Sequence, residues 1–369
     1  MTELKVDTVV NLAGTGKPNF ENGITVNSAA TSTLNLNEYT ESSSEPSSPS
    51  NGALWWDTAN EKTFIYAEGK WRETVGVSAE IVNGGTRGFA FGGDYTNVIE
   101  YVDIQTAGNA TDFGDMQSTG EGKPAGVSSK TRGVMSGNGN WMENYEYITC
   151  ATAGNATNFG STYQNDQKGP AFVSDGSRGV LVSGITDYEN SNHMEYITID
   201  TTGNGTNFGN QTVTSTDRAG CADSTRGVIF AGQNTNVIDY ITIQTTGNAT
   251  DFGDCIYSGI RHSGATADAT TGFHIAGADS SMQGEIHYVT IQTTGNAADW
   301  GDLSVAAYGC DASSDGTYVC VFFSQANTGS ISNANNIERF STASAGNASD
   351  FGDMTVSNVS RGSLSGNAS

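Results

Sequence analysis

A seven-residue motif recurs six times along the chain and constrains the fold more than any other feature. It reads Gly-Asn, two small residues, Asp or Asn, an aromatic residue and Gly. Its copies begin at Gly108, Gly154, Gly203, Gly247, Gly295 and Gly346. The intervals between these glycines run from 44 to 51 residues, which is the spacing of a structural repeat. We therefore expect a repeat array over residues 77–369.

Two further elements recur at fixed places in each unit. An apolar stretch such as TRGVIFAG, around Gly227, lies upstream of each Gly-Asn, and an alternating stretch such as IDYITIQT, from Ile238, lies between the two. Each unit then supplies four short strands: one before the TRG turn, one after it, the alternating one, and one after the Gly-Asn turn. Four strands in about 45 residues are typical of a propeller blade, so the predicted class is all-β.

The motifs also resemble a known family. Arg218-Ala219-Gly220, followed by TRGVIFAG, IDYITIQTTGN and DFGD, is similar to the kelch repeat, with its Arg-led strand, di-glycine, Tyr strand and aromatic turn. The chain departs from the kelch pattern in its terminal aromatic residue, which is Trp only at Trp300, and in the di-glycine, which only Gly92-Gly93 keeps. The resemblance covers residues 77–369 and implies a kelch-like β-propeller.

The C-terminus bears on how the array closes. Residues 361–365 align with the first strand at residues 218–222, and residues 77–84 occupy the same place ahead of the first unit. First strands therefore number seven against six of each other kind. We expect six blades, with the terminal strand paired into either the first or the last blade.

The N-terminal part has a different composition. We expect residues 1–41 to form an arm that is either extended or packed against another chain, residues 42–52 (SSSEPSSPSNG) a Ser/Pro linker, and residues 53–76 a small β-module. The module is expected to have three strands, Ala53–Asp57, Thr63–Tyr66 and Lys70–Val75. Its aromatic residues predict a mini-core or self-association surface, with a sugar-stacking platform as the alternative.

Charge excludes some classes of partner. The chain has 16 Lys and Arg against 40 Asp and Glu, a formal net charge of −24. Nucleic-acid backbones and anionic membranes would repel such a protein. No run approaches 18 apolar residues, and Met1–Lys5 opens no signal peptide, so we expect no membrane insertion and synthesis in a cytoplasm.

Several motifs are interpreted as structural. The five cysteines are odd in number and form no C-x-x-C, which predicts buried free thiols rather than disulfides or zinc ligands. The Asn-x-Thr/Ser triplets match a glycosylation sequon, but their fixed place predicts a tight turn with left-handed backbone. The Asp residues around the aromatic-Gly raise calcium as an alternative to side-chain capping, which we favour because two carboxylates fall short of a calcium shell.

Catalytic signals are weak. The four histidines share no motif, and no nucleophile elbow, H-E-x-x-H or phosphate loop is present. Carboxylate pairs for glycoside hydrolysis could be assembled from loops, but no pair stands out. The sequence predicts no catalytic residue, no cofactor and no metal.

Variation between units points to one face. Segments from Gly-Asn to the next TRG are nearly constant in length, whereas those from TRG to Gly-Asn vary, and their hairpin loops would emerge together. These loops carry aromatic, amide and carboxylate side chains that suit a glycan. The predicted ligand-binding residues are Tyr95, Asn140, Trp141, Asp187, Tyr188, His193, Asn234 and Asn236.

The N-terminal region suggests the setting. KVDTVVNLAGTGKPNFENGITVN followed by NGALWWDTANEKTFIYAEGKWRETV resembles the amino-terminal regions of marine bacteriophage virion fibre proteins. The resemblance implies a virion location, docking to other virion proteins through residues 1–75, and a homotrimer. The expected function is a fibre or appendage whose propeller binds a host-surface glycan or protein. A structural decoration, neck or collar component and a polysaccharide-degrading spike are the alternatives.

Overall fold

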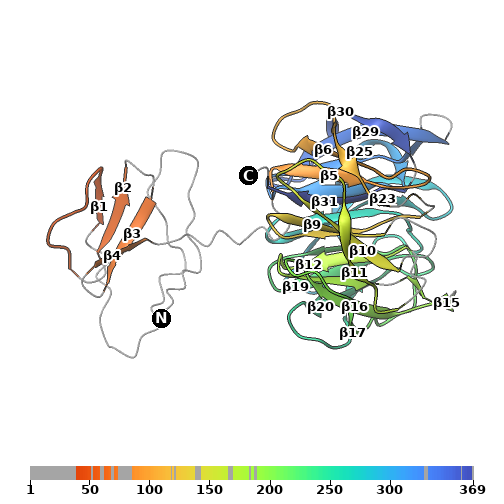
Figure 1. The fold of residues 1–369 in the computed structure, drawn as a ribbon, viewed down its shortest axis with the longest axis horizontal. Coiled ribbons are helices and arrows are strands. Elements are labelled where there is room, and N and C mark those ends of the chain that lie inside the picture. The colour runs from red at the N-terminus through yellow and green to blue at the C-terminus, as the bar shows by residue number, and fades with distance from the viewer. Residues whose placement is uncertain are drawn as a thin grey trace. The chain divides into compact units, whose positions relative to one another are not determined.

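The computed structural model describes residues 39–50, 53–58, 62–67, 70–73, 85–117, 119, 122–137, 143–164, 169–182, 184–186, 189–327, 331–358 and 360–367. The chain forms two compact units, residues 1–79 and 80–369. All regular elements in the described ranges are β-strands (Figure 1), which confirms the all-β class. These ranges contain no helix long and apolar enough to cross a membrane.

The first unit contains a four-stranded sheet in the order β1-β2-β3-β4. Its strands are β1 (Tyr39–Ser42), β2 (Leu54–Asp57), β3 (Lys62–Ala67) and β4 (Lys70–Glu73). The last three are the predicted strands of the module. β1 is an additional strand that pairs in parallel with β2. It escaped prediction because a parallel neighbour is reached through a longer chain reversal, which leaves no tight-turn signal.

Aromatic rings pack together in this sheet. Trp55 stacks on Phe64 with centroids 4.9 Å apart and meets Trp71 edge-on at 5.7 Å. Indole N–H groups need acceptors where the rings pack, and Trp55 Nε1 donates to the Ser42 carbonyl at 3.1 Å and Trp71 Nε1 to the Pro46 carbonyl at 3.4 Å. Part of the predicted Ser/Pro linker therefore contacts the module.

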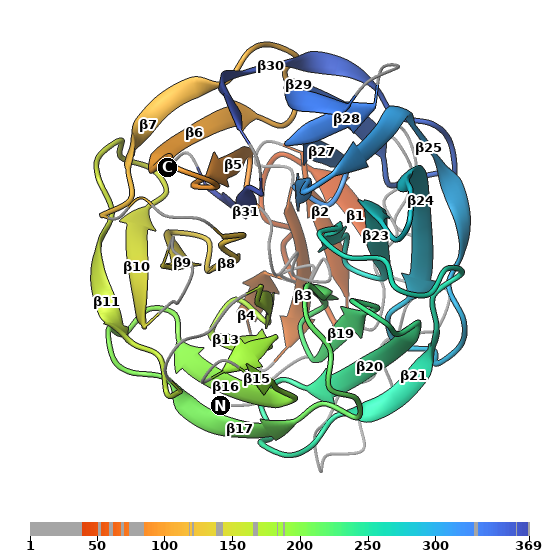
Figure 2. The same cartoon turned by 90° about the vertical axis from the view of Figure 1, so that its right-hand side faces the viewer.

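The second unit is propeller-like, with four-stranded antiparallel sheets arranged around a common axis (Figure 2). From the innermost to the outermost strand, sheet 1 contains β31 (Gly362–Gly366), β5 (Arg87–Phe91), β6 (Val98–Asp103) and β7 (Thr111–Asp115), and sheet 2 contains β8 (Gly126–Ser128), β9 (Arg132–Ser136), β10 (Asn144–Thr149) and β11 (Thr157–Ser161). In the same order, sheet 3 contains β12 (Ala171–Ser174), β13 (Arg178–Val182), β16 (His193–Thr198) and β17 (Thr206–Asn210), and sheet 4 contains β18 (Ala219–Ala222), β19 (Arg226–Phe230), β20 (Val237–Thr242) and β21 (Thr250–Asp254). Sheet 5 contains β22 (Gly264–Ala267), β23 (Thr271–Ala278), β24 (Met282–Thr290) and β25 (Ala298–Tyr308), and sheet 6 contains β26 (Asp311–Ser314), β27 (Tyr318–Phe322), β29 (Ile331–Ser341) and β30 (Ser349–Asn358). The predicted four strands per unit are thus present.

Three short strands are additions to this pattern. β28 (Gln325–Asn327) pairs with β25 and β29 and joins sheets 5 and 6 into a nine-stranded sheet. β14 (Ile185–Thr186) and β15 (Glu189–Asn190) form a small hairpin between β13 and β16.

The core lies between neighbouring sheets. The second strand of each sheet is buried on both sides, and in β5 Phe89, Ala90 and Phe91 are all fully buried. Phe89 and Phe91 share a cluster with Met135 of sheet 2 and with Leu364 of β31. This packing explains why the stretch after TRG is apolar at successive positions rather than alternating.

β31 closes the ring of sheets. It pairs antiparallel with β5, from Gly362 opposite Phe91 to Gly366 opposite Arg87, so the terminal strand belongs to sheet 1 rather than to the last sheet. Arg361, directly before β31, is fully buried, and its Nη1 lies 2.9 Å from Oε1 of Glu100. The competing first-strand copy, residues 77–84, lies outside the described residues.

The Gly-Asn turns fasten each sheet to the preceding one. After β20, Gly247 donates its N–H to the Phe208 carbonyl at 2.9 Å, and the Asn248 side-chain oxygen accepts the Asn210 N–H at 3.0 Å. The same two bonds recur at the other turns, where the side-chain acceptors are Asn109, Asn155, Asn204, Asn296 and Asn347. The sequon-like triplets therefore act as structural turns, as predicted.

The backbone of the motif differs from the prediction in detail. Gly247 and Asn248 are not among the residues with positive φ, whereas Gly253, after the aromatic residue, has a φ of 152°. A Cβ on Gly253 would lie 2.3 Å from the Gly295 carbonyl oxygen of the next turn. The oxygen that caps the motif comes from the Asn of the neighbouring unit and not from the flanking Asp carboxylates. The Asn is used for its side chain, so its backbone needs no left-handed conformation.

An Arg–Tyr stack recurs near the turns. The Arg226 guanidinium carbon lies 4.3 Å from the Tyr240 ring centroid, and its Nη1 donates to the Ile291 carbonyl of sheet 5 at 3.0 Å. Sheets 1 to 3 have equivalent stacks. In sheet 6 the partners have exchanged places: Arg339 stands at the Tyr position and lies 4.3 Å from the ring of Tyr318.

The five cysteines are buried and free, as predicted. Burial raises the pKa of Cys150 to about 12 and the pKa values of Cys255 and Cys310 to about 11. Little thiolate forms at neutral pH, so these thiols act as small apolar side chains.

Candidate ligand-recognition face

The second unit has two faces with different connections. Because neighbouring strands are antiparallel, the connections from second to third strand emerge on the same side as those from one sheet to the next. These connections form the loop face, which faces the viewer in Figure 2. The Gly-Asn turns and the TRG turns form the opposite side, the turn face. Gly85, the first described residue of this unit, lies against Gly366 at the turn face.

The exposed large apolar side chains of the described residues all lie on the loop face. Tyr95 is 74% exposed between β5 and β6, Tyr163 is 53% exposed between sheets 2 and 3, and Ile256 and Tyr257 are 45% and 36% exposed between sheets 4 and 5. Single exposed apolar residues are ordinary on a protein surface. Their confinement to one face is the distinctive feature.

Three predicted site residues have solvent-accessible positions on this face. Tyr95 and Asn234 are exposed in the β5–β6 and β19–β20 connections, where both have left-handed backbone with φ of 61° and 66°. Asn236 is half-buried, and its carbonyl accepts the Cys255 N–H at 2.8 Å. The predicted residues Asn140, Trp141, Asp187 and Tyr188 lie outside the described residues.

His193 differs from its predicted role as an exposed loop residue. It is 7% exposed and begins β16, opposite Asn210. The ring of Tyr163 covers it, with centroids 5.5 Å apart and an interplanar angle of 21°. The covering residue comes from the previous sheet-to-sheet connection, so the sequence around His193 could not show its burial.

Sequence reasoning missed Tyr163, Ile256 and Tyr257. They lie in the connections of nearly constant length, where length variation gives no signal. The available signal was chemical: a large apolar side chain in an otherwise polar connection, as in STYQNDQK after Gly160.

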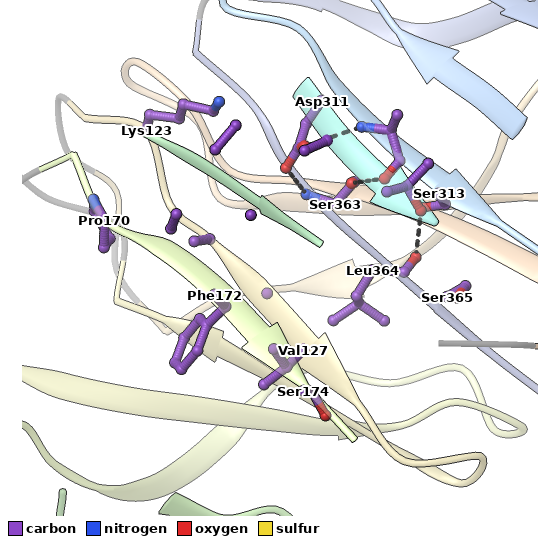
Figure 3. Close-up of a pocket in the computed structure, with 18 of the residues that line it drawn as sticks. Lys123, Val127, Pro170, Phe172, Ser174, Asp311, Ser313, Ser363, Leu364 and Ser365 are labelled. Atoms are coloured by element: carbon purple, nitrogen blue, oxygen red, sulfur yellow. Dashed lines mark hydrogen bonds between the residues drawn. The ribbon is translucent and has the colours of Figure 1, made fainter. Parts of the chain in front are cut away.

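Residues on and next to the innermost strands line a small cavity, which we term the channel (Figure 3). Its cavity of about 50 Å³ is lined largely by Gly, Ala and Ser from β8, β12, β18, β22, β26 and β31. This volume holds a few water molecules. A sugar ring therefore has no room inside the channel.

Lys123 and Asp311 place opposite charges in the channel (Figure 3). The buried Lys123 ammonium donates to the Ser263 carbonyl, and the Asp311 carboxylate accepts the Ser363 N–H at 2.8 Å and the Ala312 N–H at 3.0 Å. Burial raises the pKa of Asp311, although Lys123 and the two N–H donors act in the opposite direction.

Polar side chains gather where the connections reach the innermost strands. His262 Nε2 lies 3.5 Å from Asp217 Oδ1, and the His262 ring lies 4.7 Å from that of Tyr308. Burial raises the pKa of Tyr308, Asp217 raises it further, and Arg261 lowers it. The loop face thus combines exposed aromatic rings with charged and hydrogen-bonding groups.

A buried Ser–His pair lies beside the channel, which Ser263 lines. Ser263 Oγ and His274 Nε2 are 2.8 Å apart, but the two residues are only 0% and 2% exposed. Burial, with smaller contributions from His287 and Lys123, lowers the pKa of His274 to about 3. The imidazole is therefore neutral at neutral pH and packs the interior, and the pair receives no catalytic assignment.

Within the described ranges, no group of three or more His, Cys, Asp or Glu side chains is placed to hold a metal ion. The chain matches no model of a known protein family and no curated protein.

Proposed function

We propose that this protein is a bacteriophage virion appendage, and that its second unit is a six-bladed kelch-like propeller that recognises a host-surface glycan or protein through the loop face. The observation that carries the proposal is the confinement of Tyr95, Tyr163, Ile256 and Tyr257 to that face. Gly85, the first described residue of this unit, lies on the opposite face, against Gly366.

The chemistry of the loop face favours a polar surface ligand. Tyr rings offer a large rigid apolar surface with a hydroxyl at one end. Around them, Asn234, Asp217 and Arg261 add amide, carboxylate and guanidinium groups that hydrogen-bond to hydroxyls or peptides. The net charge of −24 disfavours polyanionic ligands.

The first unit supplies the attachment in this proposal. The resemblance of its sequence to phage fibre proteins suggests docking to other virion proteins and assembly as a homotrimer through residues 1–75. Trp56, Phe64, Tyr66 and Trp71 are only half-buried in a single chain. An assembly that covered these rings would gain the hydrophobic stabilisation that a small sheet lacks.

Competition for adsorption tests the proposal. Purified full-length protein, added to host cells before the phage, should reduce particle adsorption in proportion to its occupancy of the cell surface. Undiminished adsorption together with labelling of the capsid or neck would instead indicate a structural component. Release of reducing sugar from host polysaccharide would indicate a degrading spike.

A further inference from the structure

Sheets 3 and 5 carry the same three types of side chain at their loop-face edges. The groups are Tyr163, His193 and Glu195 in sheet 3, and Tyr257, Glu285 and His287 in sheet 5. His193 pairs with Asn210 and Glu285 with Asp302, in each case the residue after the aromatic-Gly. Positions 193 and 285 are therefore equivalent, and His and Glu have exchanged places between the two sheets.

In sheet 3 the group holds a tyrosine ring flat. Tyr163 stacks on His193, and Glu195 accepts the backbone N–H groups of Tyr163 at 2.9 Å and Gln164 at 3.2 Å. One face of the Tyr163 ring thus rests on the imidazole while the ring remains 53% exposed.

In sheet 5 the same two types of side chain, His and Glu, orient Tyr257. Its ring lies 5.5 Å from that of His287, and its hydroxyl donates to Glu285 Oε1 at 3.2 Å. Ile256, next to it, is 45% exposed and widens the apolar surface. Both tyrosines are therefore held in place before any ligand arrives, which lowers the entropy cost of binding.

Each group also contains a buried polar atom that lacks a hydrogen bond among the described residues. These atoms are His193 Nε2 and Glu285 Oε2, at the two equivalent positions. His193 Nε2 has only a 3.7 Å approach to Glu195 Oε2. Unsatisfied buried polar atoms are rare in folded proteins and are costly unless a partner supplies the bond. The equivalent residues in the other sheets are Val98, Asn144, Val237 and Asn336.

We propose that Tyr163 and Tyr257 are two carbohydrate stations, each of which stacks a sugar ring on a tyrosine ring that the neighbouring His and Glu side chains hold in place. The inference rests on the proposed function and narrows the ligand from a glycan or protein to a neutral carbohydrate. Two stations on one unit suit a repeating polysaccharide, because the second contact is intramolecular.

Saturation-transfer NMR on the full-length protein, with glucose, galactose, mannose and N-acetylglucosamine as probes, tests the stations. We expect transfer to at least one sugar, a reduced signal in Tyr163→Ala and Tyr257→Ala, and none in the double variant. On host polysaccharide each single substitution should weaken binding about tenfold or more. Thr245→Ala, at an exposed position in a Gly-Asn turn of the opposite face, is the control and should bind normally, and Tyr163→Phe should keep the stacking.

Two outcomes overturn the stations: no transfer to any of the four sugars, or transfer that survives the double substitution. Both results come from the purified protein and sugars, without host cells. If the host ligand is a protein, the NMR experiment would therefore contradict the carbohydrate stations, while host recognition by the loop face would still hold. If the protein binds sugar but does not reduce phage adsorption, the carbohydrate stations would be supported and the proposed role in host recognition would be contradicted.

Discussion

At the scale of single residues, two glycines of the recurring motif look alike in the sequence but have opposite constraints. Gly253 has a φ of 152°, and a Cβ would lie 2.3 Å from the Gly295 carbonyl oxygen, whereas Gly247 has nothing within 4 Å of a built Cβ. Gly253→Ala should lower the free energy of unfolding by about 2–4 kcal/mol, because backbone strain and a backbone clash combine. Gly247→Ala should change it by less than about 0.5 kcal/mol.

Urea unfolding of the two variants checks this difference. Equal losses of stability in Gly253→Ala and Gly247→Ala would contradict the assignment of the close contact between neighbouring sheets to Gly253.

His274 predicts a pH dependence of stability. Its pKa is about 3 in the fold against an ordinary value of 6.5, so above pH 6.5 both states are neutral. Below pH 6.5 the unfolded chain binds a proton that the folded protein excludes, and stability falls as pH falls toward 3. At pH 4.5 this single group should cost ~2–3 kcal/mol relative to neutral pH. In His274→Gln the decline between pH 6.5 and 4.5 should be shallower by that amount, and an unchanged decline in guanidinium titrations would refute the role of this histidine.

At the scale of elements, the Arg–Tyr stack forms in sheet 6 even though the Arg and the Tyr occupy each other's usual positions. Arg339 and Tyr318 stand in reversed positions in sheet 6, yet Arg339 Nη1 still reaches the Ile104 carbonyl of sheet 1 at 3.0 Å, as Arg226 reaches sheet 5. Tyr318→Arg and Arg339→Tyr should each destabilise the protein, and the double variant should recover about 1–2 kcal/mol of the summed loss. A thermal-unfolding double-mutant cycle measures this coupling. A double variant that loses the sum of both singles would show that the stack contributes nothing.

The same scale shows what the sequence could and could not predict. Four strands per unit followed from periodicity, because the repeats impose the same local pattern around Gly227 as around Gly88. The role of the Asn248 side chain as an acceptor did not follow from periodicity, because its donor, the Asn210 N–H, belongs to the preceding sheet. The burial of His193 did not follow from the sequence either, because its contact with Tyr163 joins a strand to a connection 30 residues earlier in the chain. Contacts within a unit leave a local pattern in the sequence. Contacts between units are visible in the sequence only when the same residues recur in every repeat.

At the scale of the whole molecule, closure decides the geometry of the second unit. Both candidate first strands fit the repeat, so the sequence alone could not choose between sheets. The structure pairs β31 with β5 and buries the Arg361–Glu100 ion pair, side chains 0% exposed, beside the closure. This arrangement brings Gly85 and Gly366 together on the turn face and leaves the loop face to the connections.

Because the two faces of the second unit carry different exposed residues, host recognition by the loop face can be tested. Tyr95, Tyr163 and Tyr257 lie on one face, and the exposed residues Thr201, Thr245 and Thr293 lie in the Gly-Asn turns of the other. A triple Tyr→Ala variant and a triple Thr→Ala variant therefore alter opposite faces of the same full-length protein.

The decisive measurement is binding of fluorescently labelled full-length protein and these two variants to intact host cells. If the loop face is the recognition surface, the Tyr variant should lose binding by about a hundredfold or more, because several aromatic anchors are removed together, and the Thr variant should bind like the unaltered protein. Binding that persists in the Tyr variant, or that fails in the Thr variant, would contradict recognition through the loop face.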